Sequence, residues 1–106
     1  MAAIRYYQDL KVWQMAMAMV PKVYEIANQL PKAELFALGG QMRRAAVSVP
    51  SNIAEGRCRA HTREFLQHLG IARGSLAELE TLLLVAHNLN YSAKPEALLA
   101  DLESLR

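Results

Sequence analysis

Carboxylates and histidines are the residues of this chain that could hold metal ions inside a helical bundle. Di-metal sites in such bundles place a Glu-x-x-His pair on each of two helices. In this sequence the candidate glutamates are followed three residues later by Cys, Gln, Thr or Leu; they are Glu55, Glu64, Glu78 and Glu80. The chain contains no Glu-x-x-His pair. We therefore expect no di-iron centre and no cofactor.

Cys58, His61 and His68 form a second, thinner set of possible metal ligands. Cys58 and His61 have a ligand-like spacing, and His68 falls two helical turns beyond His61. A structural zinc ion requires four ligands, and the sequence offers no second pair. We interpret these residues as a buried thiol and ordinary surface histidines. A single cysteine also excludes an internal disulfide, which favours a reduced cytoplasmic setting.

Three serines are worth testing as nucleophiles, namely Ser48, Ser51 and Ser75. None lies in a glycine elbow, and no histidine–acid pair can be assigned to any of them. The Gly39-Gly40 pair precedes Gln-Met rather than Lys-Ser or Lys-Thr, so it does not form a phosphate-binding loop. The sequence therefore predicts no catalytic residues and a protein that is not an enzyme.

A polar stripe recurs at helical spacing in the middle of the chain. Its members are Gln41, Arg44, Ser48, Asn52 and Glu55. One interpretation is a face exposed to solvent. The other is a polar seam, within the bundle or between subunits, where Arg44 pairs with Glu55, Glu78 or Glu80. Buried pairs of this kind favour one register of the helices more surely than they add stability.

A basic corner follows this stripe. Arg57, Arg59 and Arg63 lie within seven residues, with His61 among them. Residues 41–73 carry a net charge of +4, although the whole chain carries only +2. The corner is either a solvated turn or a phosphate contact helped by free N–H groups at a helix start. Because no aromatic residues are interleaved with these arginines, we expect at most weak, sequence-independent binding of RNA or DNA.

Four helices must position these residues, since apolar side chains recur at steps of three and four. The expected helices begin and end near Asp9 and Asn28, Ala33 and Ala54, Thr62 and Leu89, and a fourth begins at Pro95. Asp9 and Thr62 are predicted N-caps, and Gly56 is a predicted C′ residue. The first helix is apolar over a wide arc and continues, kinked, across Pro21.

That arc holds two parallel stripes. One contains Leu10, Trp13, Met17, Val20, Tyr24 and Ala27, and the other contains Val12, Ala16, Met19, Val23 and Ile26. With 53% apolar and 21% charged residues, and no β-alternation, the chain fits one globular domain over residues 1–106. No apolar run approaches the roughly 18 residues of a membrane span. These features predict an all-α, antiparallel up-down four-helix bundle with a short fourth helix.

The short fourth helix cannot cover three helices of about twice its length. Bare apolar patches of several hundred Å² usually mark interfaces, so we expect another copy of the chain to cover this one in a homo-oligomer. Two classes of further partner stay open: nucleic acid, or another protein for which this chain is a scaffold. We expect no membrane partner.

Three stretches resemble a known family: YQDLKVW at residues 7–13, QMRRAAVSVPSNIAEG at residues 41–56 and IARGSLAELET at residues 71–81. They resemble the four helix bundle proteins first noticed as open reading frames inside bacterial 23S rRNA intervening sequences. The chain is also similar to the accessory variability proteins of diversity-generating retroelements. Those relatives form rings of five bundles and bind nucleic acid and a reverse transcriptase. The resemblance thus implies a homopentamer without known enzymatic activity.

Overall fold

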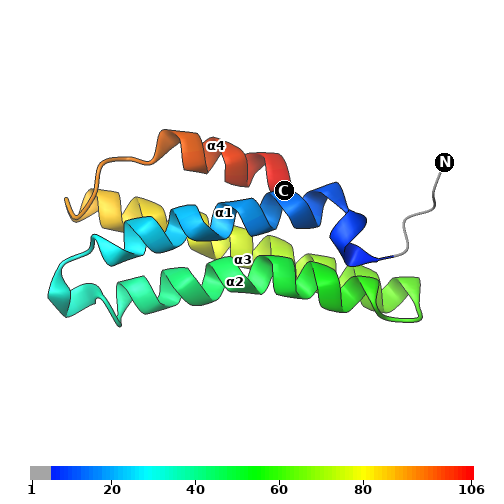
Figure 1. The fold of residues 1–106 in the computed structure, drawn as a ribbon. Coiled ribbons are helices and arrows are strands. Elements are labelled where there is room, and N and C mark those ends of the chain that lie inside the picture. The colour runs from blue at the N-terminus through cyan, green and yellow to red at the C-terminus, as the bar shows by residue number, and fades with distance from the viewer. Residues whose placement is uncertain (1–5) are drawn as a thin grey trace.

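The computed structural model describes residues 6–106, which form four α-helices and two short 3-10 helices. In chain order these are η1 (Tyr7–Asp9), α1 (Lys11–Asn28), η2 (Lys32–Glu34), α2 (Leu38–Arg57), α3 (Thr62–Asn88) and α4 (Glu96–Leu105). Successive α-helices run in opposite directions and are joined at alternate ends of the molecule (Figure 1). The described residues contain no strand. The predicted all-α bundle with a short fourth helix is confirmed.

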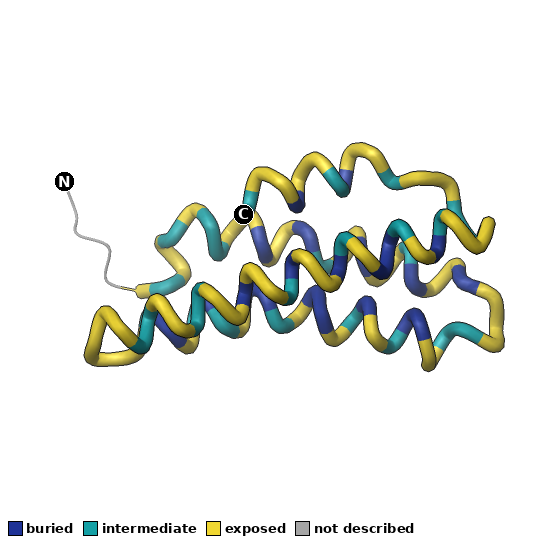
Figure 2. The backbone as a smooth tube through the Cα atoms, turned by 180° about the vertical axis from the view of Figure 1, so that it is seen from behind, coloured by how far each residue is buried: buried dark blue, intermediate teal, exposed yellow. Residues whose placement is uncertain are grey.

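The core lies along the inward sides of the four helices (Figure 2). The largest fully buried side chains include Met19, Met42, Ile53, Leu76, Leu79, Leu83 and Leu102. The contact between α2 and α3 is the most extensive, whereas α4 touches α1 and α3 more lightly. Leu102 is completely buried and holds α4 on the bundle. Truncating any of these leucines to alanine typically costs about 2–5 kcal/mol of stability.

Two predicted N-caps are wrong by one residue. Asp9 belongs to η1, so α1 begins at Lys11 with Leu10 as its N-cap. Thr62 is the first residue of α3, and His61, in extended conformation, is the N-cap. Neither cap residue makes a side-chain capping hydrogen bond. A helix can start without one when tertiary packing supplies most of its stability.

The second helix starts later and ends later than the sequence predicts. It begins at Leu38, because the preceding residues form η2, and it ends at Arg57. Gly56 therefore lies inside the helix and is buried, rather than following it as a left-handed C′ residue. A Cβ at Gly56 would lie 2.6 Å from the Cβ of His68 and 3.1 Å from Cδ1 of Phe65. The glycine is needed because α3 approaches α2 closely here.

The geometry of the turn after α3 explains where the helix stops. Asn90 has φ 62°, a left-handed conformation that asparagine tolerates. The amide of Tyr91 donates to the Ala86 carbonyl at 2.9 Å, and that of Asn90 to the His87 carbonyl at 2.9 Å. Desolvation and a hydrogen bond with Glu34 raise the pKa of the Tyr91 phenol. This contact ties the turn to η2.

Arg43 fixes the start of α2 against the segment that precedes it. Its Nη1 donates to the Leu35 carbonyl and its Nη2 to Oδ1 of Asn28, both at 2.8 Å. Its guanidinium also lies 5.8 Å from the ring centroid of Tyr24. The adjacent Arg44 is exposed and makes no hydrogen bond or ion pair with the residues described.

This contrast gives a matched pair of variants. We expect Arg43→Ala to lower the free energy of unfolding by about 2 kcal/mol, because two charge-assisted hydrogen bonds are lost. Arg44→Ala should change it by less than about 0.5 kcal/mol. Urea denaturation followed by circular dichroism measures both values. Equal effects of the two substitutions would contradict the role given to Arg43.

Candidate functional site

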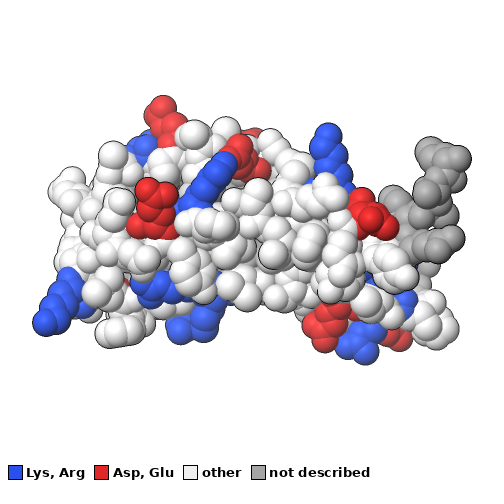
Figure 3. Space-filling model, in the orientation of Figure 1, with Lys and Arg blue, Asp and Glu red and all other residues white. Residues whose placement is uncertain are grey.

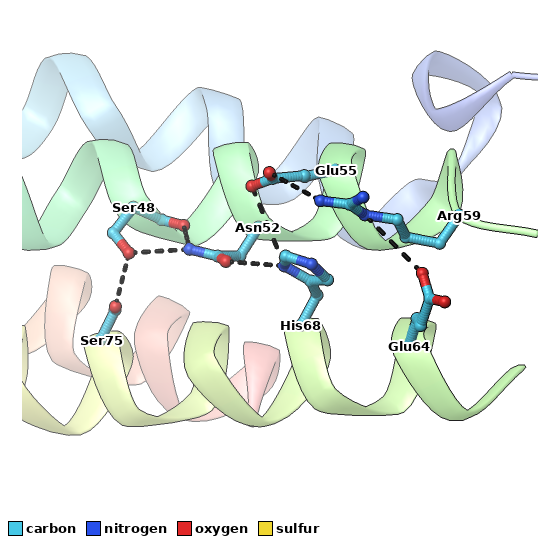
Figure 4. A network of polar contacts seen from close by, with 7 residues as sticks. All are labelled: Ser48, Asn52, Glu55, Arg59, Glu64, His68 and Ser75. Carbon is cyan, nitrogen blue, oxygen red and sulfur yellow. Dashed lines mark hydrogen bonds and ion pairs between the residues drawn. The ribbon is translucent and has the colours of Figure 1, made fainter. Parts of the chain in front are cut away.

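A polar seam runs along the contact between α2 and α3; we define it as Ser48, Asn52, His68 and Ser75 (Figure 4). The hydroxyls of Ser48 and Ser75 lie 2.8 Å apart. Nδ2 of Asn52 donates to the Ser48 carbonyl at 2.8 Å and to its hydroxyl at 3.0 Å. All four residues are half-buried. The polar groups of these residues thus bond to one another inside a helix–helix contact that is otherwise apolar.

His68 connects this seam to charged groups on the surface. Its Nδ1 lies 3.0 Å from Oδ1 of Asn52, and because that oxygen can only accept, Nδ1 is the protonated nitrogen. The same Nδ1 is 3.9 Å from the carboxylate of Glu55. Glu55 in turn binds Nη2 of Arg59 at 3.2 Å, and Nε of Arg59 lies 4.0 Å from Glu64 (Figure 4). The arrangement fixes the register of α2 against α3.

Part of the polar stripe of α2 is therefore a polar seam, and part of it is exposed to solvent. Ser48 and Asn52 are half-buried in the seam, whereas Gln41, Arg44 and Glu55 are exposed. Gln41 and Arg44 line an open polar groove together with Ser75 and Glu78.

The pairing expected for Arg44 is not present among the described residues. Glu55 pairs with Arg59, and Glu80 lies 3.8 Å from Nη1 of Arg106. Arg44 lines the same groove as Glu78 without an ion pair to it. The seam depends instead on His68 and Ser75, which the sequence pattern of α2 alone does not reveal.

The candidate metal ligands and serine nucleophiles do not come together as a metal site or as a serine–histidine pair within residues 6–106. No three His, Cys, Asp or Glu side chains there are close enough to hold a metal ion. Cys58 is exposed, contrary to the expectation of a buried thiol. The hydroxyls of Ser48 and Ser75 bond to each other, that of Ser48 also accepts from Nδ2 of Asn52, and neither bonds to a histidine among the described residues. The seam therefore holds α2 against α3 and does not pair a serine nucleophile with a histidine base.

The basic corner lies where α2 passes into α3, and its charge is partly neutralised. Arg59 carries the two ion pairs with Glu55 and Glu64. Arg57 is half-buried and has an interaction of its own. Arg63 is exposed and makes no ion pair with the described residues. Of the three predicted phosphate contacts, Arg63 is the one whose charge is fully available.

An uncharged surface lies over α1 and α2, and we name it the α1–α2 face. A shallow hollow there is lined by Tyr7, Trp13, Met17, Val20, Val47, Pro50, Ser51 and Ala54. The rings of Tyr7 and Trp13 meet edge to face with centroids 5.4 Å apart. The middle of this surface is free of charged groups (Figure 3). Met17 is 45% exposed and Val47 41% exposed, which is high for such side chains.

This face exists because α1 is apolar over more than one stripe. Its stripe of Ala16, Met19 and Val23 is buried in the core. The neighbouring stripe, which contains Trp13 and Met17, points outward beside α2. The contribution of α2 was not anticipated, although Val47, Pro50 and Ala54 follow one another at three- and four-residue steps. These apolar steps on α2 are the sequence signal that would have revealed this part of the α1–α2 face.

Comparison with known proteins identifies the family. None of the helices in the part of the chain that the structure describes is long and apolar enough to cross a membrane. No curated protein matches the chain at a significant level. Residues 8–105 match the family model described as 23S rRNA-intervening sequence protein, which is not a known family of enzymes. The match covers nearly the whole chain and confirms the resemblance drawn from the three sequence stretches. The chain therefore belongs to the 23S rRNA-intervening sequence protein family.

Proposed function

We propose that this protein is a non-enzymatic, self-assembling helical bundle whose α1–α2 face is covered by another copy of the chain. The observation that carries the proposal is the exposure of Met17 and Val47 on an uncharged surface that also includes Trp13. Contiguous exposed apolar surface of this kind usually marks an interface. The assembly would act as a scaffold whose client is another protein or a nucleic acid.

The energetics of association support a face with several anchors rather than one. Fully burying a side chain such as Met or Val stabilises a complex by about 1.5–3 kcal/mol. Association costs at least about 4 kcal/mol in lost translational and rotational freedom. In the single chain Met17 is 45% exposed and Val47 41% exposed, so assembly can bury less than half of either side chain. These two residues and Trp13 therefore do not offset that cost alone, and the rest of the face must contribute; aromatic anchors such as Trp13 are common at interface centres.

The family resemblance suggests five subunits, and a ring of five requires two different surfaces on each subunit. The α1–α2 face supplies one of them. The outer side of α3 is a candidate for the other, because it exposes small and apolar residues. These are Leu66, Gly70, Ile71, Gly74, Ala77 and Val85. A Cβ at Gly70 or Gly74 would meet nothing within 4 Å, so this side is open in the single subunit.

Light scattering on the protein eluting from a gel-filtration column tests the proposal. We expect a mass several times the 11.8 kDa of one chain, and five times that mass for the ring. A protein that stays monomeric at tens of micromolar would overturn the proposal.

We propose as a second function that the assembly binds RNA or DNA weakly and without sequence preference through Arg57, Arg59 and Arg63. The observation that favours it is the exposed, unneutralised guanidinium of Arg63 beside the start of α3. A ring would repeat this group around its axis, so weak phosphate contacts would act together. The ion pairs of Arg59 with Glu55 and Glu64 limit the contribution of that residue.

Binding of this kind depends on counterion release, so it should weaken steeply with salt. With one or two phosphates neutralised per subunit, we expect a log–log salt slope of about −1 to −2 from each engaged subunit. Fluorescence anisotropy with labelled RNA and DNA at low and moderate salt measures it. Arg63→Gln should flatten the slope, whereas Lys94→Gln, a matched loss of an exposed charge, should not. Absence of binding by the wild type at low salt would leave a protein client as the function of the scaffold.

A further inference from the structure

A small apolar cavity opens where α4 ends, between α1 and α3. It has a volume of about 180 Å³, and all four helices contribute to its walls. Its apolar lining includes Val12 of α1, Ile53 of α2 and Leu69 of α3, and Leu105 of α4 closes one side.

Two arginines lie at the mouth of this cavity. Arg73 is exposed and makes no hydrogen bond or ion pair with residues 6–106. Arg106 lies 3.8 Å from Glu80 and 3.6 Å from Glu103, both beyond ordinary hydrogen-bond length. Arg106 is thus already paired with two carboxylates, whereas the charge of Arg73 beside the apolar cavity has no partner among residues 6–106. A ligand that satisfies both features has an apolar body and one anionic end.

We propose that this cavity binds a small carboxylic acid that carries one aromatic ring or a short alkyl chain. The apolar part would lie against Val12, Leu69 and Leu76, and the carboxylate would meet the unpaired guanidinium of Arg73. A carboxylate accepts charge-assisted hydrogen bonds from a guanidinium. None of the cavity residues belongs to the α1–α2 face, so the inference does not depend on the proposed assembly.

The size of the cavity limits the ligand. An apolar cavity of about 150 Å³ suffices to bind benzene, whereas sites for drug-sized ligands occupy about 300–1,000 Å³. The 180 Å³ available here fits a single ring or a few methylene groups and excludes a long acyl chain. A ligand of about ten non-hydrogen atoms at ordinary efficiency binds with a Kd on the order of 1 mM.

Titration of the full chain with 3-phenylpropanoate, compared with the neutral 3-phenylpropanol, tests the proposal by methyl NMR. We expect saturable shifts at Leu69, Leu76 and Leu105, with the acid binding at least about threefold more tightly than the alcohol. Arg73→Gln should weaken binding of the acid about threefold and leave the alcohol unchanged. Arg63→Gln removes an exposed arginine from the same helix, away from the cavity, and should change neither.

Filling the cavity provides a second readout. Ala72 is buried in its wall, so Ala72→Leu should abolish binding of both compounds. If that variant does not fold, the proposal is still tested by comparing the binding of acid and alcohol to the wild type and to Arg73→Gln. Equal binding of the two compounds, no effect of Arg73→Gln, or no saturable shift at millimolar concentrations would each overturn the proposal.

Discussion

Gly56→Ala is expected to lower the free energy of unfolding by about 2–3 kcal/mol, a large loss for a single methyl group. The added Cβ would lie 2.6 Å from the Cβ of His68. That atom is attached directly to the backbone of α3, so it cannot rotate away and the two helices must separate. The gain of up to about 1 kcal/mol from the better helix propensity of alanine does not offset this cost.

The matched control is Gly40→Ala, since an added Cβ at Gly40 would meet only the far end of the exposed Arg44 side chain, 3.3 Å away, which is free to move. We expect this variant to be more stable than the wild type by about 0.5–1 kcal/mol, because alanine favours the helix. Urea denaturation of both variants gives the two values. A Gly56→Ala protein as stable as Gly40→Ala would show that α2 and α3 are not in the close contact described.

Met17→Glu is expected to dissociate the assembly into folded single chains of 11.8 kDa. In a single chain Met17 is 45% exposed, so a glutamate there can remain solvated. In the assembly the same carboxylate would be buried in an apolar contact without a partner, which costs several kcal/mol. Light scattering measures the mass, and circular dichroism verifies that the helix content is retained.

Met15→Glu is the control for this experiment. Met15 lies on the same helix and is 36% exposed, but it faces α4, beside Lys22 and Asp101, rather than the α1–α2 face. A glutamate at this position should leave the mass of the assembly unchanged. If both substitutions dissociate the assembly, or neither does, the interface does not lie on the α1–α2 face.

The helices were predictable because their apolar repeats are long. The stripes of α2 and α3, including Met42, Val49 and Leu76, are buried as the spacing indicates. The ends of the helices were less predictable, since Asp9 and Thr62 have good capping side chains that the structure does not use. Capping propensity contributes only about 1 kcal/mol, which a local 3-10 turn or tertiary packing can override.

The surfaces were harder to predict than the fold for a physical reason. The apolar arc of α1 is wider than one core can bury, and the sequence does not say which stripe faces inward. Packing places Met19 and Val23 in the core, leaves Met17 exposed and holds Trp13 half-buried at the edge of the core. In the same way, contact with α3, where His68 meets Asn52, decides which residues of the polar stripe of α2 are half-buried and which are exposed. Such contacts join residues far apart in the chain, which helical periodicity does not report.

The fluorescence of Trp13 tests most directly whether another copy covers the α1–α2 face. Trp13 is the only tryptophan of the chain, and it is half-buried within that face. On dilution from micromolar to nanomolar concentration, we expect its emission to shift to longer wavelength and its quenching by acrylamide to increase, in step with a falling mass. Emission and quenching that stay constant while the mass falls would place the interface elsewhere and contradict the account.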